Sequence, residues 1–284
     1  MKTKAVEGKP PVPKFPLRAR LASEMTHPQH LAFKMNLANR LWAMMMGRGL
    51  VHPLDMHHSQ NPPSHPQLME DLANELGVMK FDLKAFLREL SLSETYQRSS
   101  DAGSALDAKK VPLKSYAVAN LKALSAEQLA WSVLRATGNL AAVLATPADK
   151  KATAKYRPDK GYKIPAVNRD NVFKLFRSVY AGQPGLPEDG FSPSLSAAFF
   201  VSNEKLLIKW LAPAKGNLID RLSKLKTPAA LADELYLSLL SRFSTEEEKT
   251  SVAEYLKNNP DGRTAALSEM AWALLASTEF RLNH

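Results

Sequence analysis

Residues 39–65, NRLWAMMMGRGLVHPLDMHHSQNPPSH, connect two predicted helices through a turn and a loop rich in His and Pro. Apolar residues recur at helical spacing from Leu31 onward, and Gly47 ends the run, because glycine readily adopts the left-handed conformation that closes helices. Ser64 and Gln67 then match a capping box, the pattern that opens a new helix. The stretch therefore predicts a helix–loop–helix joint.

Patterns of the same kind recur along the rest of the chain. Ser125 with Gln128 and Ser244 with Glu247 match capping boxes, and each precedes an apolar periodic run. No run alternates apolar and polar residues between turn signals in the way that predicts β-hairpins. The predicted fold class is mainly α, a single multi-helix domain of roughly ten or more helices with long loops.

The distribution of proline and lysine suggests how the chain is organised. Residues 1–16 contain four prolines and little apolar patterning, so we expect an extended lead-in before a helical domain that covers residues 17–284. The lysine-rich span 147–170 is the place for a possible subdomain break, because long loops commonly separate packed units.

The net charge of +10 is concentrated in two segments. Residues 1–20 carry six Lys/Arg against one Glu, and residues 149–163 carry six Lys/Arg against two Asp. The six cations of the second segment are the candidate polyanion site: Lys150, Lys151, Lys155, Arg157, Lys160 and Lys163. Charge blocks are typical of solvated loops. Nucleic acid is not favoured as a partner, since no basic stripe or reader motif is present.

The sequence contains no cysteine, which excludes disulfides, thiolate metal sites and covalently attached c-type haem. We expect no cofactor. No apolar run reaches the roughly 20 residues of a membrane span. The start of the chain has no apolar stretch behind its lysines, so we expect no signal peptide in this chain; a secretion signal would lie on a longer precursor.

The helix–loop–helix joint contains the best candidates for a site. They are Arg40, Trp42, Arg48, Asp55, Ser64 and His65. One interpretation is a structural network in which Arg40, Arg48 and Asp55 form buried ion pairs. The other is an open cleft with catalytic or anion-binding groups.

Four of the seven histidines lie in the same loop, which raises the question of a metal site. Zinc sites need three or four convergent ligands at recognisable spacing, and the spacing here matches none of the known patterns. The neighbours His57 and His58 are expected to be solvent-exposed. We expect no metal ion.

Several runs resemble one known family, in the same order over nearly the whole chain. They are Asn39-Arg40-Leu41-Trp42, Gly47-Arg48-Gly49-Leu50-Val51, Asn61-Pro62-Pro63-Ser64-His65-Pro66, Thr95-Tyr96-Gln97, Leu124-Ser125-Ala126-Glu127-Gln128-Leu129, Glu234-Leu235-Tyr236-Leu237 with Arg242, and the ending from Trp272 to His284. With these runs the chain resembles the planctomycete-type domain of unknown function 1553.

The resemblance implies the C-terminal domain of a large, exported bacterial protein of uncharacterised function. It implies partners in cis or in trans, namely an upstream domain of unknown function and a cytochrome-like domain, and an extracytoplasmic location. We therefore expect a non-catalytic helical interaction or scaffold domain. Two alternatives stay open: a hydrolase acting on carbohydrate or sulfated polymer at the joint, and a polyanion-binding module that uses the lysine cluster.

Overall fold

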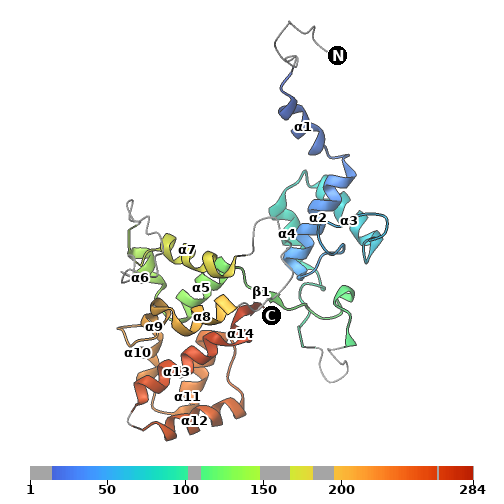
Figure 1. Ribbon diagram of the computed structural model, residues 1–284. Coiled ribbons are helices and arrows are strands. Elements are labelled where there is room, and N and C mark those ends of the chain that lie inside the picture. Colours follow the sequence, from blue (N-terminus) through green and yellow to red (C-terminus); the bar gives the residue numbers. More distant parts are fainter. Residues whose placement is uncertain (1–14, 102–109, 148–166, 182–194, 261, 284) are drawn as a thin grey trace. The chain divides into compact units, whose positions relative to one another are not determined.

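The computed structural model describes residues 15–101, 110–147, 167–181, 195–260 and 262–283 (Figure 1). These residues form fourteen α-helices and one pair of two-residue strands, which confirms the predicted mainly α fold. Among the helices of these ranges, none is long and apolar enough to cross a bilayer. The chain divides into two compact units, residues 1–121 with residue 284, and residues 122–283.

The first unit is built around one long helix. Its elements are α1 (Leu17–Met25), α2 (Leu31–Met46), α3 (Pro66–Val78), α4 (Leu83–Leu92) and the 3-10 turn η2 (Leu113–Ser115). The helix α2 packs against α3 and α4. Its buried side chains, among them Leu41, Trp42 and Met46, form the core together with Met69, Leu76, Phe86 and Tyr116.

Local hydrogen bonds explain where the helices of this unit begin and end. Gly47 closes α2 with a φ of 78°, as its position in the sequence predicts. Asp82 caps α4 by accepting from two backbone N–H groups at 3.0 Å. The predicted capping box of Ser64 and Gln67 is wrong: α3 begins at Pro66, and the Ser64 hydroxyl instead contacts the imidazole of His65 at 3.1 Å.

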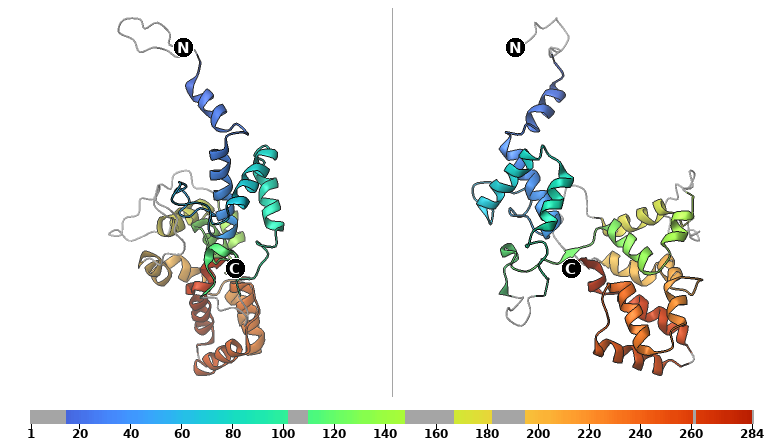
Figure 2. Two further views of the ribbon diagram at one scale, coloured as in Figure 1. Left: turned by 90° about the vertical axis from the view of Figure 1, so that its right-hand side faces the viewer. Right: turned by 180° about the vertical axis from the view of Figure 1, so that it is seen from behind.

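The helix α1 differs from the other helices of the first unit, because none of its nine residues is buried. It stands apart from α2, α3 and α4 in all three ribbon views (Figure 2). Leu17, Leu21 and Met25 recur every four residues and are 59%, 60% and 44% exposed. One side of α1 therefore presents an apolar stripe to solvent.

The second unit contains the remaining elements. They are β1 (Lys122–Ala123), α5 (Ala126–Ala136), α6 (Leu140–Ala145), α7 (Arg169–Tyr180), α8 (Leu195–Asn203), α9 (Lys205–Trp210), α10 (Leu218–Ser223), α11 (Pro228–Leu240), α12 (Glu246–Asn258), α13 (Arg263–Ala276), α14 (Thr278–Arg281) and β2 (Leu282–Asn283). The helices α5, α7, α10, α11 and α13 contribute most of one continuous apolar core.

The two short strands connect the first and last described residues of the second unit. They pair antiparallel, with Lys122 opposite Asn283 and Ala123 opposite Leu282. The backbone N–H of Leu124 continues the pairing by donating to the carbonyl of Arg281 at 2.8 Å. This strand pair therefore holds the C-terminal end of α14 and the backbone of Arg281 in place.

Two capping boxes stabilise helix starts in the second unit. The box of Ser125 and Gln128 at α5 is confirmed. The prediction of Ser244 with Glu247 is wrong by one residue, because Thr245 and Glu248 form the box that opens α12. Ser244 is buried and donates its hydroxyl to Asp233 at 2.6 Å. Because the capping box accepts either Ser or Thr at its first position, the tertiary contact of Ser244 decides which of the two neighbours caps the helix.

Two predictions on domain organisation fall mainly outside the described residues. Of the expected lead-in 1–16, only Phe15 and Pro16 are described, and α1 follows them directly. The possible subdomain break within 147–170 falls largely on residues 148–166, outside the described ranges. Both stay predictions.

Candidate functional site

The loop after α2 is fixed by a buried asparagine. The amide nitrogen of Asn39 donates to the carbonyl of Val51, and its amide oxygen accepts from the N–H of Val51, both at 3.0 Å. Gly49 lies in the same turn, where an added Cβ would come within 2.4 Å of the Val51 oxygen and 2.9 Å of the Asn39 oxygen. The turn is therefore so tight, and lies so close to the Asn39 side chain of α2, that only glycine fits at this position.

Arg40 and Asp55 form an ion pair across the loop. One guanidinium N–H of Arg40 donates to the Asp55 carboxylate, and a second donates to Asn36 at 3.2 Å. The side chains of the pair are 46% and 68% exposed. The sequence suggested a buried network that includes Arg48, whereas the structure shows a surface pair of two residues. Such pairs contribute about 0–1 kcal/mol to stability.

Tyr116 brings the other candidate residues together. Its ring lies edge-on to Trp42 at 5.3 Å between centroids and 5.8 Å from the ring of His65. Its hydroxyl donates to the backbone carbonyl of Arg48 at 3.1 Å. Burial raises the pKa of Tyr116, an effect that Trp42, Arg48 and Ser64 partly offset. The phenol is therefore a neutral hydrogen-bond donor that ties a distant segment to the end of α2.

The six candidates thus form two groups within the described residues. Arg40 and Asp55 pair with each other, while Trp42, Arg48, Ser64 and His65 surround Tyr116. The hydroxyl–imidazole contact of Ser64 and His65 resembles the nucleophile–base pair of a catalytic triad. A triad also needs a third group that orients the histidine. In the described part of the chain no carboxylate is hydrogen-bonded to His65. The contacts that Tyr116 makes with Trp42, His65 and the Arg48 carbonyl instead hold the loop against α2.

The loop histidines do not converge. His57 and His58 are exposed, as predicted. Among the residues whose positions are described, no three His, Asp or Glu side chains lie close enough together to hold a metal ion. The candidate polyanion residues Lys150, Lys151, Lys155, Arg157, Lys160 and Lys163 all lie within residues 148–166, outside the described ranges. Their role stays a prediction.

A second charged cluster lies in the second unit, between α11, α12 and α14. Arg242 forms a bidentate ion pair with Glu248, in which both hydrogen bonds measure 2.8 Å. It also donates two hydrogen bonds to the carboxylate of Glu279, at 2.6 and 3.1 Å. Its guanidinium also lies 5.1 Å from the ring centroid of Tyr236. The hydrogen bonds from Arg242 lower the pKa of Glu248 from 4.5 to about 2. Those to Glu248 and Glu279 raise the pKa of Arg242 above its usual value.

Comparison with known proteins identifies the family. A family model described as "Protein of unknown function (DUF1553)" matches residues 17–256, most of the chain. The chain belongs to the DUF1553 family. No curated protein and no solved structure matches it.

The DUF1553 match begins at Leu17, the first residue of α1, and includes residues of both compact units. It contains all six candidate residues of the joint as well as Tyr116, Arg242 and Glu248. It ends before Glu279 and before the terminal run from Trp272 to His284, so that part of the resemblance lies outside the matched range. The matched description assigns no activity to the family.

Two residues at the centre of these clusters were not found from the sequence of this DUF1553 chain. Tyr116 lies in an irregular segment 68 residues from its partner Arg48, so no local periodicity indicates the contact. Glu248 follows two other glutamates at the start of a helix, where the helix dipole alone explains them. The only available signal was the position of Glu248 three residues after Thr245, the spacing of a capping box.

Proposed function

We propose that this DUF1553 chain is a non-catalytic helical module that binds another protein domain through α1. One observation carries the proposal: α1 buries none of its nine residues, and its apolar stripe of Leu17, Leu21 and Met25 is exposed. The stripe belongs to the family's domain, since the family match begins at Leu17.

The physical argument rests on what a short helix needs in order to be stable. Isolated helices shorter than about 12–15 residues are marginal in water, and tertiary packing of an apolar face normally stabilises them. Residues recurring at every fourth position form a continuous seam that fits a groove or a second helix. Burial of one leucine contributes about 1.5–3 kcal/mol. A partner that covers this seam therefore gains binding energy and holds α1 in its helical form.

The charge around α1 indicates the chemistry of the partner. Arg18 and Arg20 lie on the helix, and residues 1–20 carry six Lys/Arg against one Glu. A surface with acidic groups around an apolar groove would complement this segment and accelerate association. The family resemblance suggests where such a surface occurs: an upstream domain of unknown function or a cytochrome-like domain, in cis or in trans. The extracytoplasmic location that the resemblance implies belongs to the same proposal.

The binding test uses the domain encoded immediately upstream, in the same or the adjacent reading frame. The full chain is titrated with that domain by calorimetry at 150 mM salt, beside the double variant L17S/L21S. We expect the double variant to bind at least tenfold more weakly, with an unchanged circular-dichroism spectrum because both leucines are exposed. The control V78S removes an apolar residue that is 74% exposed at the end of α3, and it should bind like the unmodified chain. Equal affinity of L17S/L21S and the unmodified chain would contradict the proposal.

The claim that the module is non-catalytic has its own test. The chain is incubated with sulfated and unsulfated polysaccharides, and newly formed reducing ends are measured against a heat-treated sample. We expect no release. Release that disappears in D55N and R40Q would establish the competing hydrolase at the joint. For the polyanion-binding alternative, heparin affinity should fall steeply with salt, since binding of this kind is driven by counter-ion release.

A further inference from the structure

The helices α5 and α7 of the second unit pack side by side as an antiparallel pair (Figure 1). The Glu127 carboxylate accepts from the Arg177 guanidinium at 2.8 Å, and the ring of Trp131 lies 5.3 Å from that of Phe173 between centroids. A step of four residues forward along α5 thus moves the contact four residues back along α7, about 6 Å along each helix axis. Trp131 therefore lies on the line where the two helices meet.

Trp131 offers a flat apolar surface on the outside of this helix pair. It is 37% exposed, whereas Phe173, which it meets edge-on, is buried. Among the described residues of α5 and α7, Trp131 is the only exposed aromatic side chain. A tryptophan at the edge of a core commonly exposes part of its ring. The charges around Trp131 therefore decide whether the surface suits a ligand.

Cations outnumber carboxylates on the exposed side of the two helices. The exposed charged side chains of α5 and α7 are Glu127, Asp170, Arg135, Arg169, Lys174 and Arg177. Both carboxylates form ion pairs within this surface, Glu127 with Arg177 and Asp170 with Arg169. Arg135 and Lys174 therefore leave the surface positively charged. Arg135 lies one helical turn after Trp131, so the two side chains are neighbours on α5.

The lysine-rich segment leaves and rejoins the described chain beside the same surface. The amide nitrogen of Asn168, the cap of α7, donates to the carbonyl of Pro147 at 3.4 Å. The two ends of this segment are therefore neighbours at the start of α7. Residues 149–163 add six Lys/Arg against two Asp. They are not part of the proposed site, but their charge attracts anions to this end of the helix pair.

We propose that the surface around Trp131 binds an acidic polysaccharide, a polymer whose sugar rings carry carboxylate or sulfate groups. The apolar face of one sugar ring would pack on the indole of Trp131. The acidic group of that sugar would accept hydrogen bonds from Arg135, since a guanidinium matches planar oxyanions in geometry. The inference goes beyond protein binding by α1, because every residue of this surface belongs to the second unit.

The combination of one ring and several cations distinguishes acidic sugars from other polyanions. Nucleic-acid strands stack successive bases on several aromatic side chains, and the described parts of α5 and α7 expose only Trp131. Polyphosphate would satisfy the cations, but it has no apolar surface to cover the indole. A sugar ring with an acidic substituent offers an apolar face and a negative charge in one repeating unit.

The direct test titrates the full chain by calorimetry at 50 and 150 mM salt with four probes. They are a galacturonate tetramer, a heparin tetrasaccharide, neutral cellotetraose and a short oligothymidylate. We expect a dissociation constant on the order of 0.1–1 mM for at least one acidic sugar, because the contact surface is small. The tighter of the two acidic sugars identifies the preferred group as carboxylate or sulfate. Cellotetraose should give no signal.

Substitutions assign the binding to this surface. W131L keeps an apolar side chain against Phe173 but removes the flat ring, and it should weaken binding about fivefold or more. W131Y keeps a flat ring and should retain most of the affinity. R135Q should weaken binding roughly three- to tenfold and make it less dependent on salt. The matched control is R88Q in the first unit, where the arginine side chain is 73% exposed; its binding should be unchanged.

Four results would overturn the inference. They are no binding of either acidic sugar at ten times the expected dissociation constant, equal binding of cellotetraose, tighter binding of oligothymidylate, and unchanged affinity in both W131L and R135Q. The last result would assign the binding to the lysine-rich segment alone. Circular dichroism checks that each variant is folded. If W131L loses its helical signal, W131Y and the exposed substitution R135Q still test the proposal.

Discussion

Glu248→Gln should destabilise the second unit in a way that depends on pH. A pKa lowered from 4.5 to about 2 corresponds to about 3 kcal/mol of stabilisation by the folded state before screening. The side chains of Arg242 and Glu248 are 36% and 23% exposed, so solvent screens their attraction. We therefore expect a loss of about 1–2 kcal/mol at pH 7. Glutamine can still accept the capping bond from Thr245, so the substitution removes the charge and keeps the helix cap.

The sign of the pH dependence follows from the lowered pKa of Glu248. A carboxylate with a pKa below its unfolded value stabilises the folded state above pH 4.5, and this stabilisation disappears as the pH falls toward 2. The difference in unfolding free energy between the unmodified chain and E248Q should thus be constant from pH 7 to about pH 5.5 and shrink at pH 4 and 3.

Urea unfolding followed by circular dichroism at those pH values measures this difference. The matched control is E246Q, two residues earlier in the same helix. The Glu246 side chain is 89% exposed and, among the described residues, pairs only with Lys249. Its effect should stay within about 0.5 kcal/mol. The reasoning is refuted if E248Q is as stable as the unmodified chain at pH 7, or if its deficit is the same at pH 3.

Two further substitutions test the joint in the first unit by the same urea assay. Gly49→Ala should cost about 2 kcal/mol or more, because the new Cβ would meet the Val51 oxygen at 2.4 Å. The control Gly262→Ala should be nearly neutral, because its Cβ would meet no atom of the described residues within 4 Å. Equal effects of the two substitutions would contradict the close approach at Gly49. Arg40→Gln should cost less than about 1 kcal/mol, since the pair with Asp55 is exposed, and a larger loss would show that the pair contributes more than a surface contact.

The elements that could be predicted from sequence are those with local causes. Gly47 ends α2, Asp82 caps α4, and Ser125 with Gln128 opens α5, because the hydrogen bonds involved span only a few residues. The predictions failed where a distant contact decides between neighbours. Burial of Ser244 against Asp233 leaves Thr245 to cap α12, and nothing within a few residues of Ser244 indicates this.

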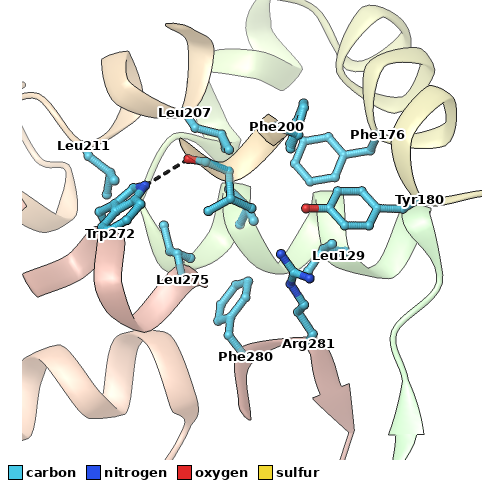
Figure 3. A pocket seen from close by; sticks show the side chains of 12 residues that line it. Leu129, Phe176, Tyr180, Phe200, Leu207, Leu211, Trp272, Leu275, Phe280 and Arg281 are labelled. Atoms are coloured by element: carbon cyan, nitrogen blue, oxygen red, sulfur yellow. Dashed lines mark hydrogen bonds between the residues drawn. The ribbon is translucent and has the colours of Figure 1, made fainter. Parts of the chain in front are cut away.

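The candidate site was predictable in part for the same reason. Arg40 and Asp55 do form a pair. How exposed that pair is depends on the path of the loop, and no local sequence pattern indicates this path. The cluster around Tyr116 combines side chains from α2, the start of α3 and a segment near η2. The contact between the Tyr180 ring and the Arg281 guanidinium (Figure 3) likewise joins residues that are 101 positions apart. Contacts at such separations follow from packing of the whole unit.

The pairing of β1 with β2 has a consequence for any longer polypeptide that contains this chain. Residues 122 and 283 are direct neighbours across the strand pair, so the backbone enters and leaves the second unit at one place. A domain with adjacent termini can be inserted into a loop of another protein, or circularly permuted, with only a short linker. The second unit could therefore be moved between protein contexts as one block that keeps its own apolar core.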